Sequence, residues 1–168
     1  SQSPVLYFGR LSSEKGVADL IRAMKLLPDL RLVVAGDGPQ RADMEKRTQS
    51  LGLKNVEFTG HLKKDDLDKL ISSAQFTIFP SYAYETMGKS ILESYAMGRA
   101  VIASDLGSRR ELVEQGKTGI LYPVGDIERL AAAMAWLQCN PALSQQMGEA
   151  GRELVRELHS QEDHLGKL

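Results

Sequence analysis

Cysteine is nearly absent from this 168-residue sequence, which contains Cys139 alone. A single cysteine excludes an internal disulfide bond and a zinc site made of four cysteines. We expect Cys139 to pack a C-terminal helix together with Trp136 and Leu137. No apolar run approaches the ~20 residues of a membrane-spanning helix, and the first four residues lack the basic and apolar regions of a signal peptide. We therefore expect a cytoplasmic setting.

An excess of charge of one sign is also missing. Lys and Arg together number 21 and Asp and Glu number 22, which gives a formal net charge of −1. Without a net positive charge, no field of the whole domain favours nucleic acid or an anionic membrane. We expect no nucleic-acid partner, and any anion site has to be local. A hydrophobic content of 42% and this length suffice for one compact domain with a core, but not for two.

Short runs rich in β-branched residues alternate with longer amphipathic stretches. Strands are predicted at residues 5–8, 31–35, 56–59, 76–79, 100–103 and 120–122. Helices are predicted at residues 16–27, 40–51, 64–73, 89–97, 127–138 and 143–158. This alternation favours right-handed crossovers between parallel strands. We expect an α/β domain with a Rossmann-like, doubly wound parallel sheet of about six strands and helices on both faces.

Candidate ligand-binding residues follow the first predicted strand. Ligands of open parallel sheets bind beyond the carboxyl ends of the strands, near helix N-termini. There Gly9 permits a sharp turn, Arg10 offers a planar fork of donors, and Lys15 places a point charge near a helix start. A diphosphate suits these groups. An Arg and a Lys on a solvated surface loop would look the same, so the residues alone leave both interpretations open.

A second group of candidates follows the fourth predicted strand. The apolar pattern places a helix start near Gly88, so that Glu85 lies in the preceding loop and Glu93 about one and a half turns into the helix. Two carboxylates placed in this way suit hydrogen bonds from the hydroxyls of a polyol. The amides of Met87, Gly88 and Lys89 suit an anion. The alternative is an acidic residue beside a helix N-terminus and an exposed helical glutamate, both of which are common.

Six sequence landmarks recur in an order that resembles a known family. They are Gly9-Arg10-Leu11 with Glu14-Lys15-Gly16, Gly36-Asp37-Gly38-Pro39, Phe58-Thr59-Gly60-His61-Leu62, Pro80-Ser81 with Glu85 and Glu93, the run from Ala96 to Ser104, and Gly116-Lys117-Thr118-Gly119 with Pro123. In these landmarks, and over nearly its whole length, the chain resembles the C-terminal domain of family 4 glycosyltransferases. These are retaining enzymes with the two-Rossmann-domain architecture called GT-B.

The resemblance implies a role for individual residues. In the family, the residues matching Arg10 and Lys15 hold the donor diphosphate. The residue matching Glu85 contacts the hydroxyls of the transferred sugar, and the one matching Glu93 binds the ribose. Arg10, Lys15 and Glu85 are thus the candidate catalytic residues. The predicted substrate-binding residues are Gly9, Arg10, Lys15, His61, Leu62, Glu85, Met87, Gly88, Lys89 and Glu93, with the loop at 61–62 near the base.

The resemblance also implies an activity. The family transfers a glycosyl unit from a nucleotide-diphosphate sugar with retention and without an obligatory metal, so we expect no cofactor. Acceptor recognition, and any contact with a membrane, would lie in an N-terminal domain missing from this chain. The isolated domain should then bind its donor without turning it over. Thr86-Met87 and Lys89-Ser90 depart from the common family pattern, which leaves the sugar open, and the base stays open among uracil, guanine and adenine.

Two other classes of function remain as alternatives. A nucleotide-sugar epimerase with a GT-B-like donor domain should match the order of landmarks less well. A catalytically inactive nucleotide-binding module would not need to keep Arg10, Lys15, Glu85 and Glu93 together. The segment Asp66-Leu67-Asp68 has the Asp-x-Asp form of metal-dependent glycosyltransferases, but its lysine neighbours favour a solvated helix face. We therefore expect no metal site.

Overall fold

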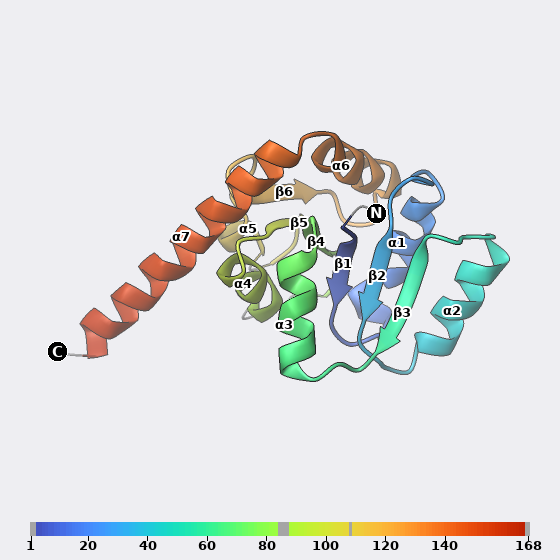
Figure 1. The fold of residues 1–168 in the computed structure, drawn as a ribbon, viewed down its shortest axis with the longest axis horizontal. Helices are drawn as coiled ribbons and strands as arrows, with labels where there is room; N and C mark the ends of the chain where they lie inside the picture. The colour runs from blue at the N-terminus through green and yellow to red at the C-terminus, as the bar shows by residue number, and fades with distance from the viewer. Residues whose placement is uncertain (1–2, 84–87, 108, 167–168) are drawn as a thin grey trace.

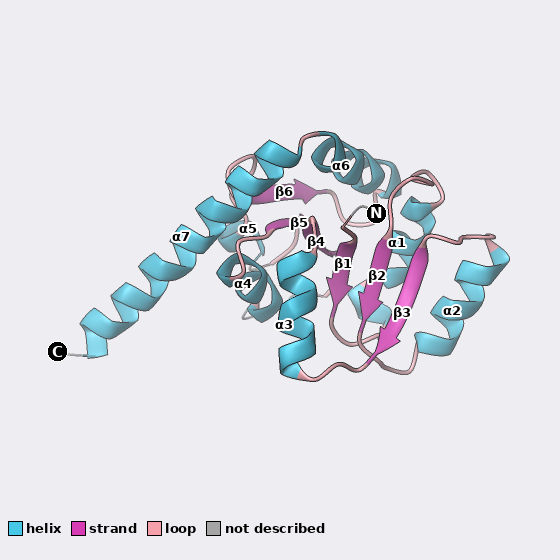
Figure 2. Ribbon diagram, viewed as in Figure 1, coloured by secondary structure: helices cyan, strands magenta, loops and turns pink. Residues whose placement is uncertain are grey.

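A computed structural model of the chain describes residues 3–83, 88–107 and 109–166. Within these ranges, six parallel strands form one sheet in the order β3-β2-β1-β4-β5-β6. The strands are β1 Val5–Phe8, β2 Leu32–Ala35, β3 Val56–Gly60, β4 Phe76–Phe79, β5 Ala100–Ser104 and β6 Gly119–Tyr122. From β1 the chain winds outward to β3, then crosses back to β4 and continues to β6 (Figures 1 and 2). The expected doubly wound parallel sheet is confirmed.

Helices cover both faces of the sheet. They are α1 Val17–Met24, α2 Arg41–Ser50, α3 Lys64–Ser73, α4 Lys89–Ala96, α5 Arg109–Leu112, α6 Ile127–Cys139 and α7 Pro141–Gly166, with a short 3₁₀ helix η1 at Ser13–Lys15. The helix α1 packs between α2 and α6 on one face, whereas α4 packs against α7 on the other. The C-terminal part of α7 projects away from the body of the molecule (Figure 1). Among the described residues, no helix is both long and apolar enough to cross a membrane.

The four central strands hold the core. Every residue of β1, β2, β4 and β5 is buried, whereas the edge strands β3 and β6 are partly exposed, with Gly60 the one buried residue of β3. Strands covered on both faces need largely apolar runs, and these segments are apolar apart from the buried Thr77 and Ser104. Because all strands are parallel, their carboxyl ends meet at one edge of the sheet. The loops that carry the predicted site residues start at this edge.

The predicted strands agree with the observed ones to within one residue at each end, but three helical features differ. The helix α1 ends at Met24, because the chain tightens into three-residue turns from Leu27 to Met24 and from Leu26 to Ala23 before Pro28. The helix α7 continues to Gly166, eight residues beyond the predicted end. Residues 159–163 of this extension are exposed, so they add no apolar periodicity that would mark a helix. The short elements η1 and α5 were not predicted.

The expected packing of three residues in α6 is wrong for two of them. Leu137 is buried, but the side chain of Trp136 is 44% exposed and Cys139 is exposed. Trp136 and Cys139 are three residues apart and share the exposed face of this helix, whereas Leu137 points to the core.

Candidate functional site

A pocket of about 350 Å³ opens at the carboxyl edge of the sheet. It is lined by one residue of α3 and by residues at or just after the carboxyl ends of three neighbouring strands: Phe8, Gly9, Arg10, Ala35, Gly36, Asp37, His61, Leu62 and Leu67. We call it the carboxyl-edge pocket. The structure thus brings together four of the predicted substrate-binding residues, which are Gly9, Arg10, His61 and Leu62. The walls of the carboxyl-edge pocket are largely apolar.

The loops after β1 and β2 are tied together by backbone hydrogen bonds. The amide of Leu11 donates to the carbonyl of Asp37 at 2.9 Å, and the amide of Gln40 donates to the carbonyl of Leu11 at 2.9 Å. Gly38 lies so close that an added Cβ would be 2.5 Å from the carbonyl oxygen of Leu11. The segment Gly36-Asp37-Gly38 therefore serves close approach of two loops. This close contact explains why both positions are glycine, so the glycines need no dinucleotide-binding motif to explain them.

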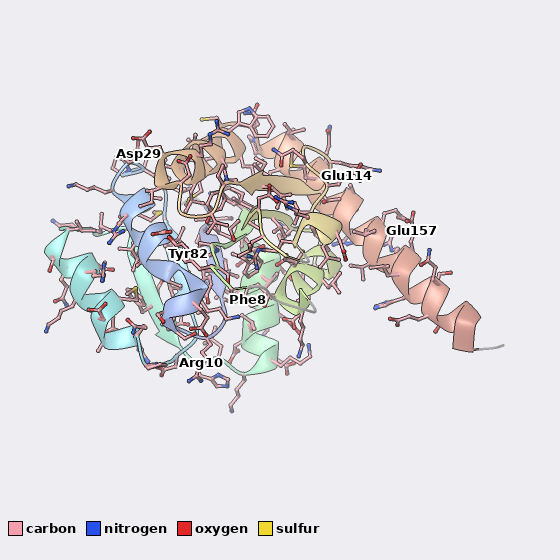
Figure 3. All side chains as sticks on the ribbon, turned by 180° about the vertical axis from the view of Figure 1, so that it is seen from behind. Phe8, Arg10, Asp29, Tyr82, Glu114 and Glu157 are labelled. Carbon is pink, nitrogen blue, oxygen red and sulfur yellow. The ribbon has the colours of Figure 1, made fainter. Side chains whose placement is uncertain are left out.

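Arg10 lies at the rim of the pocket with its side chain exposed (Figure 3). The backbone of Arg10 is held by a hydrogen bond from the strand, because the hydroxyl of Tyr7 donates to the carbonyl of Arg10 at 2.8 Å. Tyr7 itself is buried in the central strand β1. The core of the sheet thus sets the direction in which the Arg10 loop leaves β1, while the Arg10 side chain stays exposed.

Lys15 belongs to η1, and this turn is attached to the loop after β4. The carbonyl of Glu14 accepts hydrogen bonds from the amide of Tyr82 at 2.8 Å and from the hydroxyl of Ser81 at 3.0 Å. Gly16 follows with φ 73°, and a Cβ there would lie 2.1 Å from the carbonyl oxygen of Pro80. The loop after β1 and the loop after β4, whose bonded residues are 67 apart in sequence, are therefore joined through their backbones.

The carboxylate of Glu14 points back into its own turn. The hydroxyl of Ser12 donates to Glu14 Oε1 at 2.6 Å. This bond is the largest cause of a pKa of Glu14 below its usual range. A carboxylate that stays ionised and accepts from Ser12 helps to fold the turn that presents Lys15.

The helix α4 begins as predicted. Gly88 is its N-cap, with φ 53° and ψ 33°, and Lys89 is its first residue. Glu93 lies one turn further on, and its Oε1 is 4.0 Å from Lys89 Nζ. The side chain of Glu93 is 39% exposed and that of Lys89 is 83% exposed. Glu85 and Met87 lie outside the described residues. Gly88, Lys89 and Glu93 do not line the carboxyl-edge pocket but belong to the next strand-to-helix connection along the same edge.

Asp37 also lines the pocket, although it is not among the predicted site residues. Its Oδ1 accepts from the amide of Gly38 at 2.8 Å, and its Oδ2 lies 3.0 Å from the guanidinium of Arg41. The amide of Gly38, and then Arg41, hold the pKa of Asp37 below its usual value. It supplies a fixed hydrogen-bond acceptor at the pocket wall. Its position directly after the second strand was the available signal, the same one that selected Arg10 after the first.

The Asp-x-Asp segment lies on α3. Asp66 is exposed, and Asp68 pairs with Lys64 at 3.2 Å, an arrangement typical of a solvated helix face. Between them, Leu67 turns inward and lines the pocket. Among residues 3–83, 88–107 and 109–166, no group of three or more His, Cys, Asp or Glu side chains is arranged to hold a metal ion.

Comparison with known proteins agrees with this architecture. Residues 2–154 match the sequence profile of the family described as glycosyl transferases group 1. The chain belongs to this family. It is 37% identical over 150 residues to the alpha-D-kanosaminyltransferase of Streptomyces kanamyceticus, a match that covers 86% of this chain and 39% of the relative.

Solved structures of glycosyltransferases contain the same fold. The sucrose-phosphate synthase of Thermosynechococcus elongatus matches with a TM-score of 0.85 and 33% identity over 93% of this chain and 41% of its own. HepE of Anabaena, solved in complex with UDP-glucose, matches with a TM-score of 0.86 and 26% identity over 100% of this chain and 50% of its own. The chain thus spans half or less of the length of these group 1 relatives and GT-B neighbours.

Proposed function

We propose that this chain is the C-terminal, donor-binding domain of a retaining family 4 glycosyltransferase. The whole enzyme would transfer a glycosyl unit from a nucleotide-diphosphate sugar to an acceptor in glycan, polysaccharide or glycolipid synthesis. The observation that carries this proposal is the carboxyl-edge pocket, with Arg10 at its rim and the Lys15 turn and the start of α4 beside it. Family membership supports the proposal, as does the UDP-glucose complex of HepE.

The pocket suits the nucleoside part of the donor. A volume of about 350 Å³ falls within the range of small-molecule sites, and apolar walls with few polar groups are typical of such sites. The base would lie against Leu62 and Leu67, within reach of the backbone at His61. Asp37 would accept a hydrogen bond from the nucleoside. These positions leave the diphosphate on the side of Arg10 and Lys15.

The diphosphate would be bound by positive groups of the protein itself. Arg10 and Lys15 supply cationic donors, and the first amides of α4 after Gly88 have no acceptor within the helix, as in every α-helix. A helix N-terminus and cations together favour an anion. No metal is then needed to neutralise the phosphates, and the proposed reaction has no cofactor.

The same groups would act in catalysis. Cleavage of the bond between the anomeric carbon and the diphosphate oxygen leaves negative charge on the nucleoside diphosphate. Donors that are already in place stabilise this charge without reorganising, and the loss of one such donor costs about 2.7 to 4 kcal/mol in catalytic sites. Arg10 and Lys15 would therefore stabilise the leaving group. Glu85 would orient the transferred sugar through its hydroxyls, and Glu93 would bind the ribose.

We propose that acceptor recognition lies on a separate N-terminal domain. This chain spans only 50% of HepE, and its carboxyl-edge pocket is open to solvent. A donor domain alone would bind the nucleotide sugar and leave it intact. Adding the second domain should restore turnover.

Chemical-shift mapping of the isotope-labelled chain tests the proposal. Millimolar UDP, GDP and ADP are titrated separately, and at least one should shift the amides of residues 9–11, 36–38, 60–62 and 88–89. A polar pocket of about 460 Å³ near Gln75 and Arg99, at the amino ends of the strands, serves as an internal control. The proposal is wrong if no nucleotide shifts the carboxyl edge, or if shifts gather around Arg99 instead.

A further inference from the structure

A charged side chain is buried beside the proposed donor site. Arg109 lies on the short helix α5, after β5, and only 1% of it is exposed. It is among the largest fully buried side chains of the described residues. Arginine is rarely buried to this extent, because removing a guanidinium from water costs several kcal/mol unless it is well bonded. A buried arginine at this edge therefore calls for a specific role.

The guanidinium of Arg109 joins the carboxyl ends of β4 and β5. Its Nε donates to the carbonyl of Ser104 at 2.8 Å, at the end of β5. Its two terminal nitrogens donate to the carbonyls of Ser81 and Ala83, each at 3.2 Å, in the loop after β4. A planar fork can reach three separate acceptors in this way, whereas the ammonium of a lysine is a single point of contact.

The contacts continue from this loop to the turn that carries Lys15. The hydroxyl of Ser104 donates to the carbonyl of Ser81 at 2.6 Å, so this carbonyl is held from two sides. Ser81 and Tyr82 in turn donate to the carbonyl of Glu14, at 3.0 and 2.8 Å. Lys15 is the next residue. A chain of hydrogen bonds thus leads from the buried guanidinium, through the loop after β4, to the backbone of Glu14, next to Lys15, which we propose binds the diphosphate.

We propose that Arg109 is a positioning residue of the donor site. It fixes residues 81–83, which fix the carbonyl of Glu14 and so set the place of Lys15 relative to the carboxyl-edge pocket. With only 1% of Arg109 exposed, it would act on the donor through these residues and not by direct contact. This inference rests on the proposed function, because it concerns how the donor site is held in shape. Arg110, the next residue, is a matched contrast: its side chain is 69% exposed and pairs with Asp105 at 2.6 Å on the surface.

The first test uses the chain without any ligand. Arg109→Met keeps the apolar stem and removes the fork, and Arg110→Met makes the same change on the surface. Hydrogen exchange of the Tyr82 amide, which is bonded to Glu14, should be at least about tenfold faster in Arg109→Met and unchanged in Arg110→Met. Unchanged exchange in both variants would overturn the proposal. If Arg109→Met does not fold, Arg109→Lys, which keeps the charge but not the fork, is measured in its place.

The second test asks whether Arg109 acts through Lys15. Affinity is measured by calorimetry for whichever of UDP, GDP and ADP the wild-type chain binds most tightly, in Arg109→Met, Lys15→Met and the double variant. Arg109→Met alone should weaken binding about tenfold, and it should have little further effect once Lys15 is absent. Equal losses in both backgrounds would mean that Arg109 acts on the fold in general. If the wild type binds none of the three nucleotides, the proposed function fails, while the exchange measurement still decides the role of Arg109.

Discussion

Gly36 and Gly9 are in backbone contact so close that a Cβ on Gly36 would lie 1.9 Å from the carbonyl oxygen of Gly9. Gly36 also has φ 140°, a conformation that residues with a side chain rarely adopt. Both residues line the carboxyl-edge pocket. The loops after β1 and β2 can therefore approach this closely only because Gly36 has no side chain.

Gly36→Ala should destabilise the fold more than a glycine substitution without this contact. Strain in φ and the collision with backbone that cannot move aside should together cost roughly 2 to 4 kcal/mol. Gly52→Ala is the control, because Gly52 also has a positive φ, of 67°, but nothing lies within 4 Å of the added Cβ. It should lose about 1 kcal/mol. Urea unfolding of the two variants measures the difference, and equal losses would show that the loops can separate.

Arg10→Met and Lys15→Met should each weaken nucleoside diphosphate binding. A hydrogen bond to a charged group contributes about 1.5 to 3 kcal/mol, so each loss should exceed about tenfold. Arg31→Met is the control, because Arg31 precedes β2 at the opposite edge of the sheet, where its exposed guanidinium pairs with Glu57 at 3.3 Å. It should bind as the wild type does. A similar loss in all three variants would indicate attraction by overall charge instead of a site.

Glu85 and Glu93 should differ in what they bind. If Glu93 holds the ribose, Glu93→Ala weakens the nucleoside diphosphate and the nucleotide sugar alike, because both carry the ribose. If Glu85 contacts only the sugar, Glu85→Ala leaves the affinity for the nucleoside diphosphate nearly unchanged. In a longer protein that includes the N-terminal domain, Glu85→Ala should strongly reduce turnover. Equal losses of nucleoside diphosphate affinity in the two variants would require the two roles to be withdrawn.

The stability of the domain should fall in alkaline solution partly because of Tyr95. Its hydroxyl donates to Thr118 at 2.8 Å inside the core, and burial raises its pKa to about 12. An unfolded tyrosine ionises near pH 10, so the contribution of Tyr95 is complete below that pH and is lost as the pH rises towards 12. In Tyr95→Phe, the free energy of unfolding should decline less steeply over this window. The same slope in both proteins would show that groups other than Tyr95 cause the loss of stability at high pH.

The strands and most helices could be predicted because their signals are local. Largely apolar runs mark β1, β2, β4 and β5, and Gly88 marks the start of α4. The end of α7 could not be predicted from apolar periodicity, because residues 159–163 are exposed. The short α5 contains too few residues for any periodicity to appear.

The site was predicted in part for a similar reason. The rule that ligands bind after parallel strands selects Arg10 from its position in the sequence, and applied to the second strand it would also have selected Asp37. Arg109 carries no such signal. A sequence shows two adjacent arginines at 109 and 110, and only the fold reveals that one is buried against three carbonyls while the other pairs with Asp105 on the surface.

We propose above all that this chain binds a nucleoside diphosphate through its own cations and amides. Calorimetric titration of the wild-type chain with UDP, GDP and ADP, in a metal chelator and again with added magnesium or manganese, tests it most directly. We expect weak binding of at least one of the three nucleotides, with the same affinity in chelator and in metal. Failure of all three to bind, or binding that appears only when a divalent metal is added, would contradict the account.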